Sequence, residues 1–511
     1  MLVKVFGSAV FGVEATTITV EVNTEKGIGY HLVGLPDSAI KESSFRIAAA
    51  LKNNSYQFPG KKIIVNMAPA DLRKEGSAYD LTIAVGILAA SSQITSKEIE
   101  NYIIMGELSL DGTLQPIKGA LSIAIKAKEE GFKGVIIPIQ NVKEAAIVED
   151  LDVYGVSNVT EVIEFFEGKG NLEPTRIDTT EEFSKTLNFP EHDFADVKGQ
   201  EGIKRCMEIA AAGGHNIILI GPPGSGKTML AKRLPSILPP MTLNEALETT
   251  KIHSVAGKIK DVGLLNQRPF RSPHHTASSV SLVGGGSYPQ PGEISLAHNG
   301  VLFLDELPEF KREVLEVMRQ PLEDREVTIS RAKFTITYPS SFMLVASMNP
   351  SPGGYFNDPD APVSSSPAEM QRYLSKISGP LLDRIDIHIE VTPVPFEKLT
   401  ETRPAESSVL IRERVTKARE IQSKRFEQYS TIHYNAQMTT KQIRTYCALD
   451  DSSLQLLKTA MERLNLSARA YDRILKVSRT IADLEASEVV KSNHIAEAIQ
   501  YRSLDRDGWL G

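Results

Sequence analysis

A glycine-rich string of eight residues, placed directly after a short apolar run, constrains this chain more than any other feature. The apolar run is Ile217–Ile220, and the string reads Gly221, Pro222, Pro223, Gly224, Ser225, Gly226, Lys227 and Thr228. A buried strand, a glycine-rich loop and a helix in this order form a P-loop, in which backbone N–H groups and the positive helix N-terminus face phosphates. We therefore predict an ATP site where Lys227 neutralises the β- and γ-phosphates and Thr228 is a ligand of Mg²⁺.

A second apolar run ends in two acidic residues. Val301–Leu304 has the pattern of a central strand, and Asp305 and Glu306 follow it. We expect Asp305 to hold the Mg²⁺ shell and Glu306 to polarise the attacking water. Alone, such a pair could simply cap the next helix, but beside a P-loop it favours ATP hydrolysis over ATP binding alone.

A third apolar run, Phe342–Met348, is followed by Asn349. A polar side chain at the end of this strand could orient the lytic water beside the γ-phosphate. An asparagine after a strand is usually only a turn residue. The order of the three apolar runs nevertheless favours Asn349 as a third catalytic residue.

The length and composition of the chain limit how many domains it has and which classes of protein it can belong to. The 511 residues suggest about three domains, and the net charge of −7 argues against a uniformly basic nucleic-acid binder but allows a locally basic pore. Cys206 and Cys447 are too few for a disulfide framework and are interpreted as buried thiols in a reducing compartment. Because no apolar run approaches the ~18 residues of a membrane span and the start does not form a secretory signal, we predict a cytoplasmic protein that does not enter a membrane.

Together these motifs resemble the AAA+ ATPases, and further motifs narrow the resemblance to magnesium-chelatase-like AAA+ proteins of the YifB/ComM type. The further motifs are Arg271–Thr276, Tyr373–Pro380, Ser378–Asp386, Ser467–Arg473 and Arg479–Leu484. The resemblance covers essentially the whole chain and implies a multidomain α/β fold. The expected parts are a Lon-protease-like (ribosomal-S5-like) α/β domain over 1–172, a linker over 173–190, a P-loop AAA+ core over 191–395 with a parallel sheet and helices on both faces, and a C-terminal α-helical lid over 405–511.

The resemblance also implies a ring, expected to be a homo-hexamer, with ATP between neighbouring subunits. Arg384 matches the arginine finger, which would stabilise transition-state charge at the neighbour's γ-phosphate. Alternatively, Asp383, Arg384 and Asp386 form only a local ion network. Arg469 matches the lid's sensor arginine, which is expected to touch the γ-phosphate of its own chain. Arg473, one helical turn later, is the alternative, and a solvated basic helix face is the plain interpretation of both.

The amino-terminal block resembles the Lon-type peptidase fold but lacks its catalytic dyad. When the chain is aligned on Lys74–Gly76, the serine position is occupied by Ala78 and the lysine position by Leu121. Ser77 and Lys118 lie near these positions, but a displaced pair would rarely meet at hydrogen-bonding distance. We therefore predict a structural or partner-binding module, which could bind a protein partner, rather than a peptidase.

One departure from the family concerns a metal. Family members often carry a cysteine cluster just after the sensor asparagine, whereas residues 350–367 of this chain contain no cysteine. Because the thiolate ligands are missing, we expect no zinc site there.

Two segments could contact a substrate in the pore of a ring. Arg325–Thr337 is predicted to form a hairpin with its turn at Ser330–Lys333, which places Arg331 and Lys333 to contact DNA phosphates. A solvated turn is the alternative. The glycine-rich loop Val283–Tyr288 offers backbone amides and one aromatic ring to a nucleic acid, or else is a flexible surface loop.

The leading hypothesis is an ATP-driven motor that translocates DNA, similar to a helicase acting on branched DNA in recombination or natural transformation. The motor chemistry follows from the residues, whereas the DNA cargo follows mostly from the resemblance. The alternative is a protein-remodelling ATPase similar to the motor subunit of magnesium chelatase, and the additional amino-terminal block weighs against it.

Overall fold

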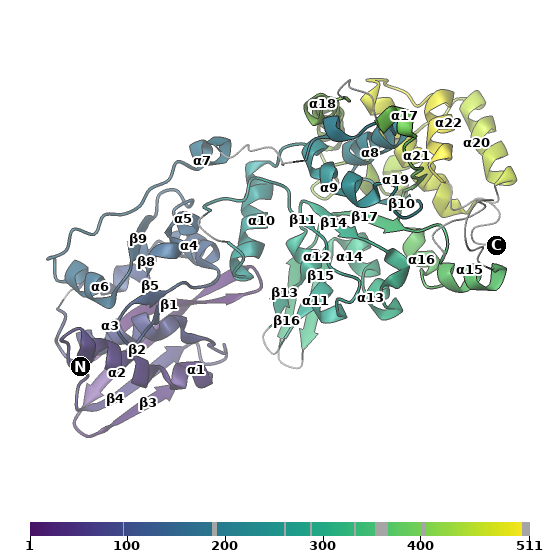
Figure 1. Ribbon diagram of the computed structural model, residues 1–511. Coiled ribbons are helices and arrows are strands. Elements are labelled where there is room, and N and C mark those ends of the chain that lie inside the picture. The colour runs from purple at the N-terminus through teal and green to yellow at the C-terminus, as the bar shows by residue number, and fades with distance from the viewer. Residues whose placement is uncertain are drawn as a thin grey trace. The chain divides into compact units, whose positions relative to one another are not determined.

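The computed structural model describes residues 1–95, 97–185, 192–259, 262–286, 289–331, 334–352, 366–399, 405–464 and 466–502 (Figure 1). The chain divides into two compact units. The first comprises Met1–Leu187 with Thr242–Asn266, and the second comprises Asn188–Met241 with Gln267–Gly511. No helix within the described ranges is both long enough and apolar enough to cross a membrane.

The first unit contains a mixed sheet with the strand order β3-β4-β2-β1-β5-β8-β9. Its strands are β1 (Leu2–Phe11), β2 (Glu14–Glu25), β3 (Gly29–Val33), β4 (Lys62–Ala68), β5 (Tyr102–Ile104), β8 (Gly134–Pro138) and β9 (Asp152–Val156), and β6 (Glu107–Leu108) and β7 (Leu114–Gln115) form a small separate hairpin. Strands β1 and β2 pair antiparallel over the whole length of β1, whereas β5, β8 and β9 run parallel. The buried side chains of β2 alternate along the strand, as expected when one face packs on the core.

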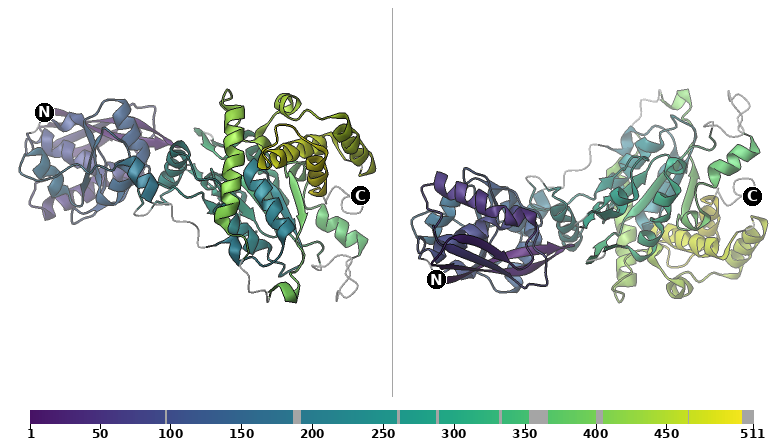
Figure 2. Two further views of the ribbon diagram at one scale, coloured as in Figure 1. Left: turned by 90° about the horizontal axis from the view of Figure 1, so that it is seen from above. Right: turned by 90° about the horizontal axis from the view of Figure 1, so that it is seen from below.

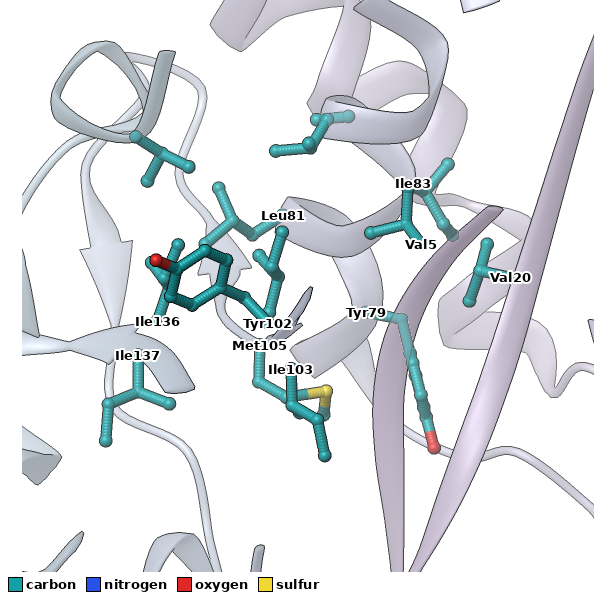
Figure 3. Packing of buried hydrophobic residues seen from close by; sticks show 14 of the residues in the cluster. Val5, Val20, Tyr79, Leu81, Ile83, Tyr102, Ile103, Met105, Ile136 and Ile137 are labelled. Atoms are coloured by element: carbon teal, nitrogen blue, oxygen red, sulfur yellow. The ribbon is translucent and has the colours of Figure 1, made fainter. Parts of the chain in front are cut away.

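The first unit contains the helices α1 (Ser38–Lys41), α2 (Ser43–Asn53), α3 (Asp80–Ala90), α4 (Ala120–Glu129), α5 (Val142–Ala145), α6 (Val159–Phe166) and α7 (Thr179–Lys185). Helices α3 and α4 pack on strands β1 and β2 of the sheet. Every residue of α3 is buried, which explains why its sequence is apolar on all sides. Figure 3 shows Leu81 and Ile83 of this helix in the same core as Val5 and Val20 of the β1–β2 hairpin.

The first unit also includes a helix that the sequence analysis placed in the AAA+ core. Helix α10 (Leu243–Val255) packs on α4, and the amide of Gly119 donates to the carbonyl of Ser254 at 3.2 Å. Further along this segment, Asn266 Nδ2 donates to the carbonyl of Phe183 at 3.3 Å. The chain therefore passes between the two units after residues 187, 241 and 266. Local sequence could not reveal this, because the partners of α10 lie more than a hundred residues away.

The second unit is built on a parallel sheet with the strand order β11-β14-β17-β10-β18. The strands are β10 (Ile217–Ile220), β11 (Phe270–Arg271), β14 (Val301–Leu304), β17 (Met343–Met348) and β18 (Ile387–Glu390), and all four neighbouring pairs are parallel. The continuous apolar runs in β10, β14 and β17 are typical of strands buried on both faces. Because the strands are parallel, the residues that follow them lie at one edge of the sheet.

Helices and two hairpins complete the ATPase part of this unit. The helices are α8 (Glu201–Gly213), α9 (Lys227–Ile237), α11 (Ser279–Val283), α12 (Glu293–Leu296), α13 (Arg312–Glu316), α14 (Arg319–Asp324), α15 (Pro367–Leu374), α16 (Gly379–Leu382) and α17 (Phe396–Leu399). The hairpins are β12 (Gly284–Gly285) with β13 (Gln290–Pro291), and β15 (Glu326–Arg331) with β16 (Phe334–Pro339).

The carboxyl-terminal part is helical, as predicted, and belongs to the same compact unit. It consists of α18 (Ser408–Phe426), α19 (Thr440–Tyr446), α20 (Asp451–Arg463), α21 (Ala468–Leu484) and α22 (Ser492–Gln500). The long helix α18 packs along α8 and α9, and α21 also contacts α8 (Figure 2).

A buried polar network joins these helices to the sheet. His215 Nδ1 lies 3.0 Å from Asp386 Oδ2 next to β18, and its Nε2 lies 2.8 Å from the hydroxyl of Thr480 on α21. Burial lowers the pKa of His215. Burial opposes the ionisation of Asp386, but Arg473 and His215 hold its pKa well below the usual value. Lys476, also on α21, has its pKa lowered to about 8, mainly by burial. Removing one member would leave buried partners unsatisfied, so this network fixes how α21 sits on the sheet.

Candidate active site

The P-loop lies between β10 and α9, as the sequence predicts. Gly224 and Gly226 have φ angles of 77° and 90°, which favour glycine, and they turn the loop into the first residue of the helix. A Cβ on Gly221 would lie 2.2 Å from the carbonyl oxygen of Val391, so no larger residue fits there. These local requirements explain why the loop is recognisable in the sequence.

Lys227 points back into the loop that precedes it. Its Nζ donates to the carbonyls of Gly221 and Pro222 at 2.7 and 2.9 Å and lies 3.3 Å from Asn349 Oδ1. Burial lowers the pKa of Lys227, while the nearby carboxylates of Asp305 and Glu306 oppose that shift. The structure therefore brings Asn349 to the P-loop lysine, although 122 positions separate them in the chain.

The strand end at Asp305 meets the start of α9. The hydroxyl of Thr228 donates to Asp305 Oδ2 at 2.9 Å. Hydroxyl and carboxylate oxygens are ligands that suit Mg²⁺. No group of three or more His, Cys, Asp or Glu side chains that could hold a metal occurs among the described residues. A Mg²⁺ ion at Thr228 and Asp305 would therefore take most of its shell from phosphates and water.

Ser347 is a site residue that the sequence analysis missed. Its hydroxyl donates to Asp305 Oδ1 and accepts from the amide of Glu306 at 3.2 Å, and the side chain is fully buried in β17. It thus fixes the second carboxylate oxygen of Asp305 and the backbone of Glu306. A signal existed in the sequence, because Ser347 is a hydroxyl residue in an otherwise apolar strand just before Asn349.

The three arginines expected at the γ-phosphate lie at the opposite edge of the sheet. Arg384 contacts Glu323 and the carbonyl of Pro380, and it stands just before β18. The next residues bond to Asn216, just before β10, so this edge is formed by the amino-terminal ends of the strands. The P-loop, in contrast, follows the carboxyl-terminal end of β10.

The lid arginines share that edge. Arg469 Nη1 lies 2.5 Å from Asp383 Oδ2, and Arg473 Nη1 lies 2.8 Å from Asp386 Oδ1. In this structure Arg469 therefore pairs with Asp383 at the edge opposite the P-loop, and its role at the γ-phosphate of its own chain stays a prediction. The physical reason is that α21 is held at the amino-terminal edge of the sheet by its contacts with α8 and by the polar network around His215.

Comparisons with known proteins cover nearly the whole chain. Family profiles described as "Magnesium chelatase, subunit ChlI", "Subunit ChlI of Mg-chelatase" and "Magnesium chelatase, subunit ChlI C-terminal" match residues 193–399, 20–141 and 405–502. The chain is 45% identical over 500 residues to protein YifB of Escherichia coli (strain K12), which covers 98% of this chain and 96% of that protein. It is also 45% identical over 510 residues to the competence protein ComM of Haemophilus influenzae, and this alignment covers 99% of this chain and 98% of that protein.

The chain belongs to the magnesium-chelatase-like AAA+ family of the YifB/ComM type. Membership of this AAA+ family implies the use of ATP and Mg²⁺. A stretch of 173 residues is in addition 30% identical to the Lon protease of Lachnoclostridium phytofermentans, over 31% of this chain and 21% of that protein. The predicted family and the predicted fold class, a Lon-like α/β part with a parallel-sheet AAA+ core and a helical C-terminal part, are confirmed.

For this AAA+ chain, we expect Ser347→Ala to weaken the affinity for Mg²⁺ without unfolding the protein. The variant loses the hydroxyl that holds Asp305, and such supporting contacts typically change metal affinity by about 10- to 100-fold. The half-saturating Mg²⁺ concentration for ATP hydrolysis should rise by that order. Ser340→Ala is the matched control, since Ser340 is also buried in this unit and its hydroxyl has no hydrogen-bond partner within the described residues. Equal Mg²⁺ curves for both variants would refute the role of Ser347.

The two candidate substrate segments are neighbours in the YifB/ComM-type core. A Cβ on Gly285 would lie 3.0 Å from Arg331 Nη2, and a Cβ on Gly284 would lie 2.9 Å from Ile329 Cδ1. Figure 1 shows α11, β13, β15 and β16 together at one end of the core. Ser330 and Arg331, which were expected in the turn, instead belong to strand β15, where Ser330 pairs with Thr335 and Arg331 with Phe334. Lys333, Tyr288 and residues 353–365, most of the segment where zinc ligands were sought, lie outside the described residues.

Proposed function

We propose that this protein is an ATP-driven motor that assembles as a ring and translocates branched or single-stranded DNA. The observation that carries the proposal is the separation of its active-site residues. One edge of the sheet holds Lys227, Thr228, Asp305, Glu306 and Asn349, and the opposite edge holds Arg384. A complete site therefore needs the arginine edge of a second copy.

Each residue at the first edge has a proposed part in hydrolysis. Lys227 binds the β- and γ-phosphates, and Thr228 with Asp305 binds Mg²⁺, which supplies charge neutralisation on the phosphates. Glu306 accepts a proton from the attacking water, and Asn349 orients that water or the γ-phosphate. The contact of Asn349 with Lys227 supports the last assignment.

The opposite edge is proposed to act on the nucleotide of the next subunit. Arg384 would be the arginine finger. Arg469, which pairs with Asp383 next to Arg384, would assist the finger, and Arg473 is the alternative to Arg469. Six subunits are the number that the resemblance to AAA+ rings implies. A head-to-tail interface of this kind closes into a ring when its rotation permits.

The proposed DNA cargo is supported by two observations. The relative from Haemophilus influenzae is named a competence protein. In addition, the glycine loop at Gly284–Gly285 packs against Arg331, so that backbone amides and a guanidinium gather at one end of the core. Such a combination suits a phosphate backbone.

A four-strand DNA junction tests the proposal. The purified protein with ATP and Mg²⁺ should convert the junction into its product duplexes, and the junction should stimulate phosphate release. Lys227→Ala and Glu306→Gln are the controls that should abolish conversion. A protein that hydrolyses ATP but neither responds to nor converts any junction, fork or single strand would refute the DNA assignment.

We expect Arg331→Gln to weaken DNA binding in a salt-dependent manner. Loss of one phosphate contact should reduce the slope of log affinity against log salt by about one, whatever the DNA sequence. Fluorescence anisotropy across a salt series measures this slope. Arg331→Lys keeps the charge and is the matched control. An unchanged slope in the glutamine variant would remove Arg331 from the proposed DNA surface.

A second candidate is a protein-remodelling ATPase like the motor subunit of magnesium chelatase. It is favoured by the family profiles, whose descriptions all name the ChlI subunit of magnesium chelatase. The amino-terminal block no longer weighs against this reading, because residues 20–141 match one of these profiles. Stimulation of phosphate release by a protein partner and by no DNA would favour it.

The amino-terminal Lon-like domain is proposed to bind a partner rather than to cleave peptides. The hydroxyl of Ser77 donates to the carboxylate of Glu107, whereas the side chain of Lys118 lies against Gly257. Ser77 and Lys118 thus have different partners, which supports the absence of a catalytic dyad.

The absence of zinc and a cytoplasmic location remain predictions from the sequence.

A further inference from the structure

Residues 383–386, here called the finger loop, are held through their backbone carbonyls. The side chain of Asn216, which lies just before β10, donates to the carbonyl of Arg384 at 2.9 Å. Nη1 of Arg502, which follows α22, donates to the carbonyls of the next two residues at 2.8 and 3.4 Å. Two side chains from distant parts of the chain therefore fix the backbone that carries the proposed arginine finger.

Asn216 attaches the finger loop to the sheet. Its backbone carbonyl accepts from the amides of Asp386 and Ile387 at 3.0 and 3.1 Å. Its Oδ1 accepts from the amide of Leu344 at 2.8 Å. Because Leu344 belongs to β17, which pairs with β10, the finger loop is bonded to the ends of two neighbouring strands.

Arg502 is brought to the finger loop by a short extension of the sheet. It pairs in parallel with His388 of β18, and the amide of His388 donates to the carbonyl of Tyr501 at 2.7 Å. Arg502 is only 3% exposed, so its guanidinium has lost most of its water and depends on protein acceptors. Burial and the charge of Arg502 hold the pKa of His388 well below its usual value, so the nearby imidazole is neutral and does not repel the guanidinium.

The guanidinium of Arg384 is held less completely than its backbone. It contacts the carbonyl of Pro380 and the carboxylate of Glu323, a side chain that is 60% exposed. Nε of Arg384 is buried and has no hydrogen-bond partner within the described residues. Since ion pairs with exposed partners are weak, this guanidinium can exchange Glu323 for an acceptor outside its own chain while its backbone stays in place.

We propose that Arg502 is a positioning residue for the arginine finger. By holding the two carbonyls that follow Arg384, it keeps the finger loop where Arg384 reaches the nucleotide of a neighbouring subunit. A misplacement of about 1 Å at an active site can cost about 100-fold in rate. The inference rests on the proposed role of Arg384, whereas the contact between Arg502 and the finger loop does not.

Hydrogen exchange of the full-length Arg502→Met variant tests the contact itself. Methionine fills a similar volume but cannot donate, so the finger loop loses this support. Peptides that cover the finger loop and β18 should exchange faster than in the native protein, and peptides that cover the P-loop should not. Arg412→Met is the matched control, because Arg412 donates to a different backbone carbonyl of this unit, that of Ser236, at 2.9 Å. Unchanged exchange over the finger loop in Arg502→Met would overturn the inference.

Phosphate release shows whether the contact matters for turnover. Turnover of Arg502→Met should fall by about 100-fold, while its affinity for ATP stays native because its own P-loop is intact. Arg502→Lys keeps a charged donor and should restore part of the turnover, and Arg412→Met should keep all of it. Native turnover in Arg502→Met, or a loss of ATP affinity as large as the loss of turnover, would overturn the inference. If Arg502→Met does not fold, Arg502→Gln, which is too short to reach both carbonyls, must show the same changes.

Mixed assemblies separate a failure of this inference from a failure of the proposed ring. Arg502→Met mixed with Lys227→Ala should regain phosphate release, because the Lys227→Ala subunits supply an intact finger loop. Arg384→Ala mixed with Lys227→Ala is the reference. Recovery in the reference but not with Arg502→Met would overturn the inference. If neither mixture recovers, the proposed action of Arg384 on a neighbour fails, and the exchange and turnover of Arg502→Met still decide whether Arg502 positions the finger loop.

Discussion

Glu306→Gln is expected to lower ATP turnover by about 10²- to 10⁴-fold, the usual contribution of a general base. Glutamine has the same size as glutamate but its amide cannot accept the proton of the attacking water. Binding should persist, because the Thr228–Asp305 contact and the Lys227 contacts do not involve this side chain. The amide of Glu306 still donates to Ser347, so the backbone should keep its place.

Two measurements decide this prediction. Phosphate release gives the turnover, and titration with a fluorescent ATP analogue in Mg²⁺ gives the affinity. Glu309→Gln is the matched control, because Glu309 lies one turn further along, is similarly exposed and pairs only with Lys376 among the contacts described for it. Should Glu306→Gln retain turnover within about tenfold of the native protein, the water must be activated by another group.

Arg384→Ala is expected to lower turnover by about 10³- to 10⁵-fold, as for other arginine fingers. In one chain the mostly buried Arg384 contacts Glu323 and the carbonyl of Pro380, at the edge opposite the P-loop. If it acts on the nucleotide of a neighbour, the alanine variant should still bind ATP at its own P-loop. Loss of turnover with retained affinity is therefore the expected pattern.

Mixing two inactive variants separates a finger from a structural arginine. The Lys227→Ala variant has an inactive P-loop site but keeps Arg384. The Arg384→Ala variant keeps an intact P-loop site but lacks the arginine that would act on its neighbour. In a mixed ring about one interface in four combines an intact site with an intact finger, so phosphate release should reappear. The control mixture of Lys227→Ala with Glu306→Gln damages the same site in both partners and should stay inactive. No recovery in the first mixture would place Arg384 outside the neighbour's active site.

Much of the nucleotide edge could be predicted because its signals are local. Gly224 and Gly226 need positive φ angles, Thr228 starts a helix, and Asp305 and Asn349 end apolar runs that become neighbouring parallel strands. Ser347 was missed because its signal, one hydroxyl residue in an otherwise apolar strand, does not show which group that hydroxyl contacts. The role of Ser347 depends on the pairing of β17 with β14, and this pairing cannot be predicted from the residues around Ser347 alone.

The positions of α10 and of the arginines could not be predicted for the same reason. The packing of α10 on α4 depends on residues from another part of the chain. Arg469 was correctly placed on a lid helix. Its contact with Asp383, rather than with the P-loop, depends on how that helix packs.

The amino-acid sequence by itself determined the family, the fold class and the chemical identity of the phosphate-binding edge, because these depend on backbone conformations and residue orders that neighbouring residues impose on one another. Only the tertiary structure decided that residues 242–266 join the amino-terminal unit, that Ser347 holds Asp305 and that the arginines stand at the far edge of the sheet. Those features are contacts between side chains distant in the chain, and such contacts exist only after the strands have been ordered and the helices packed on them.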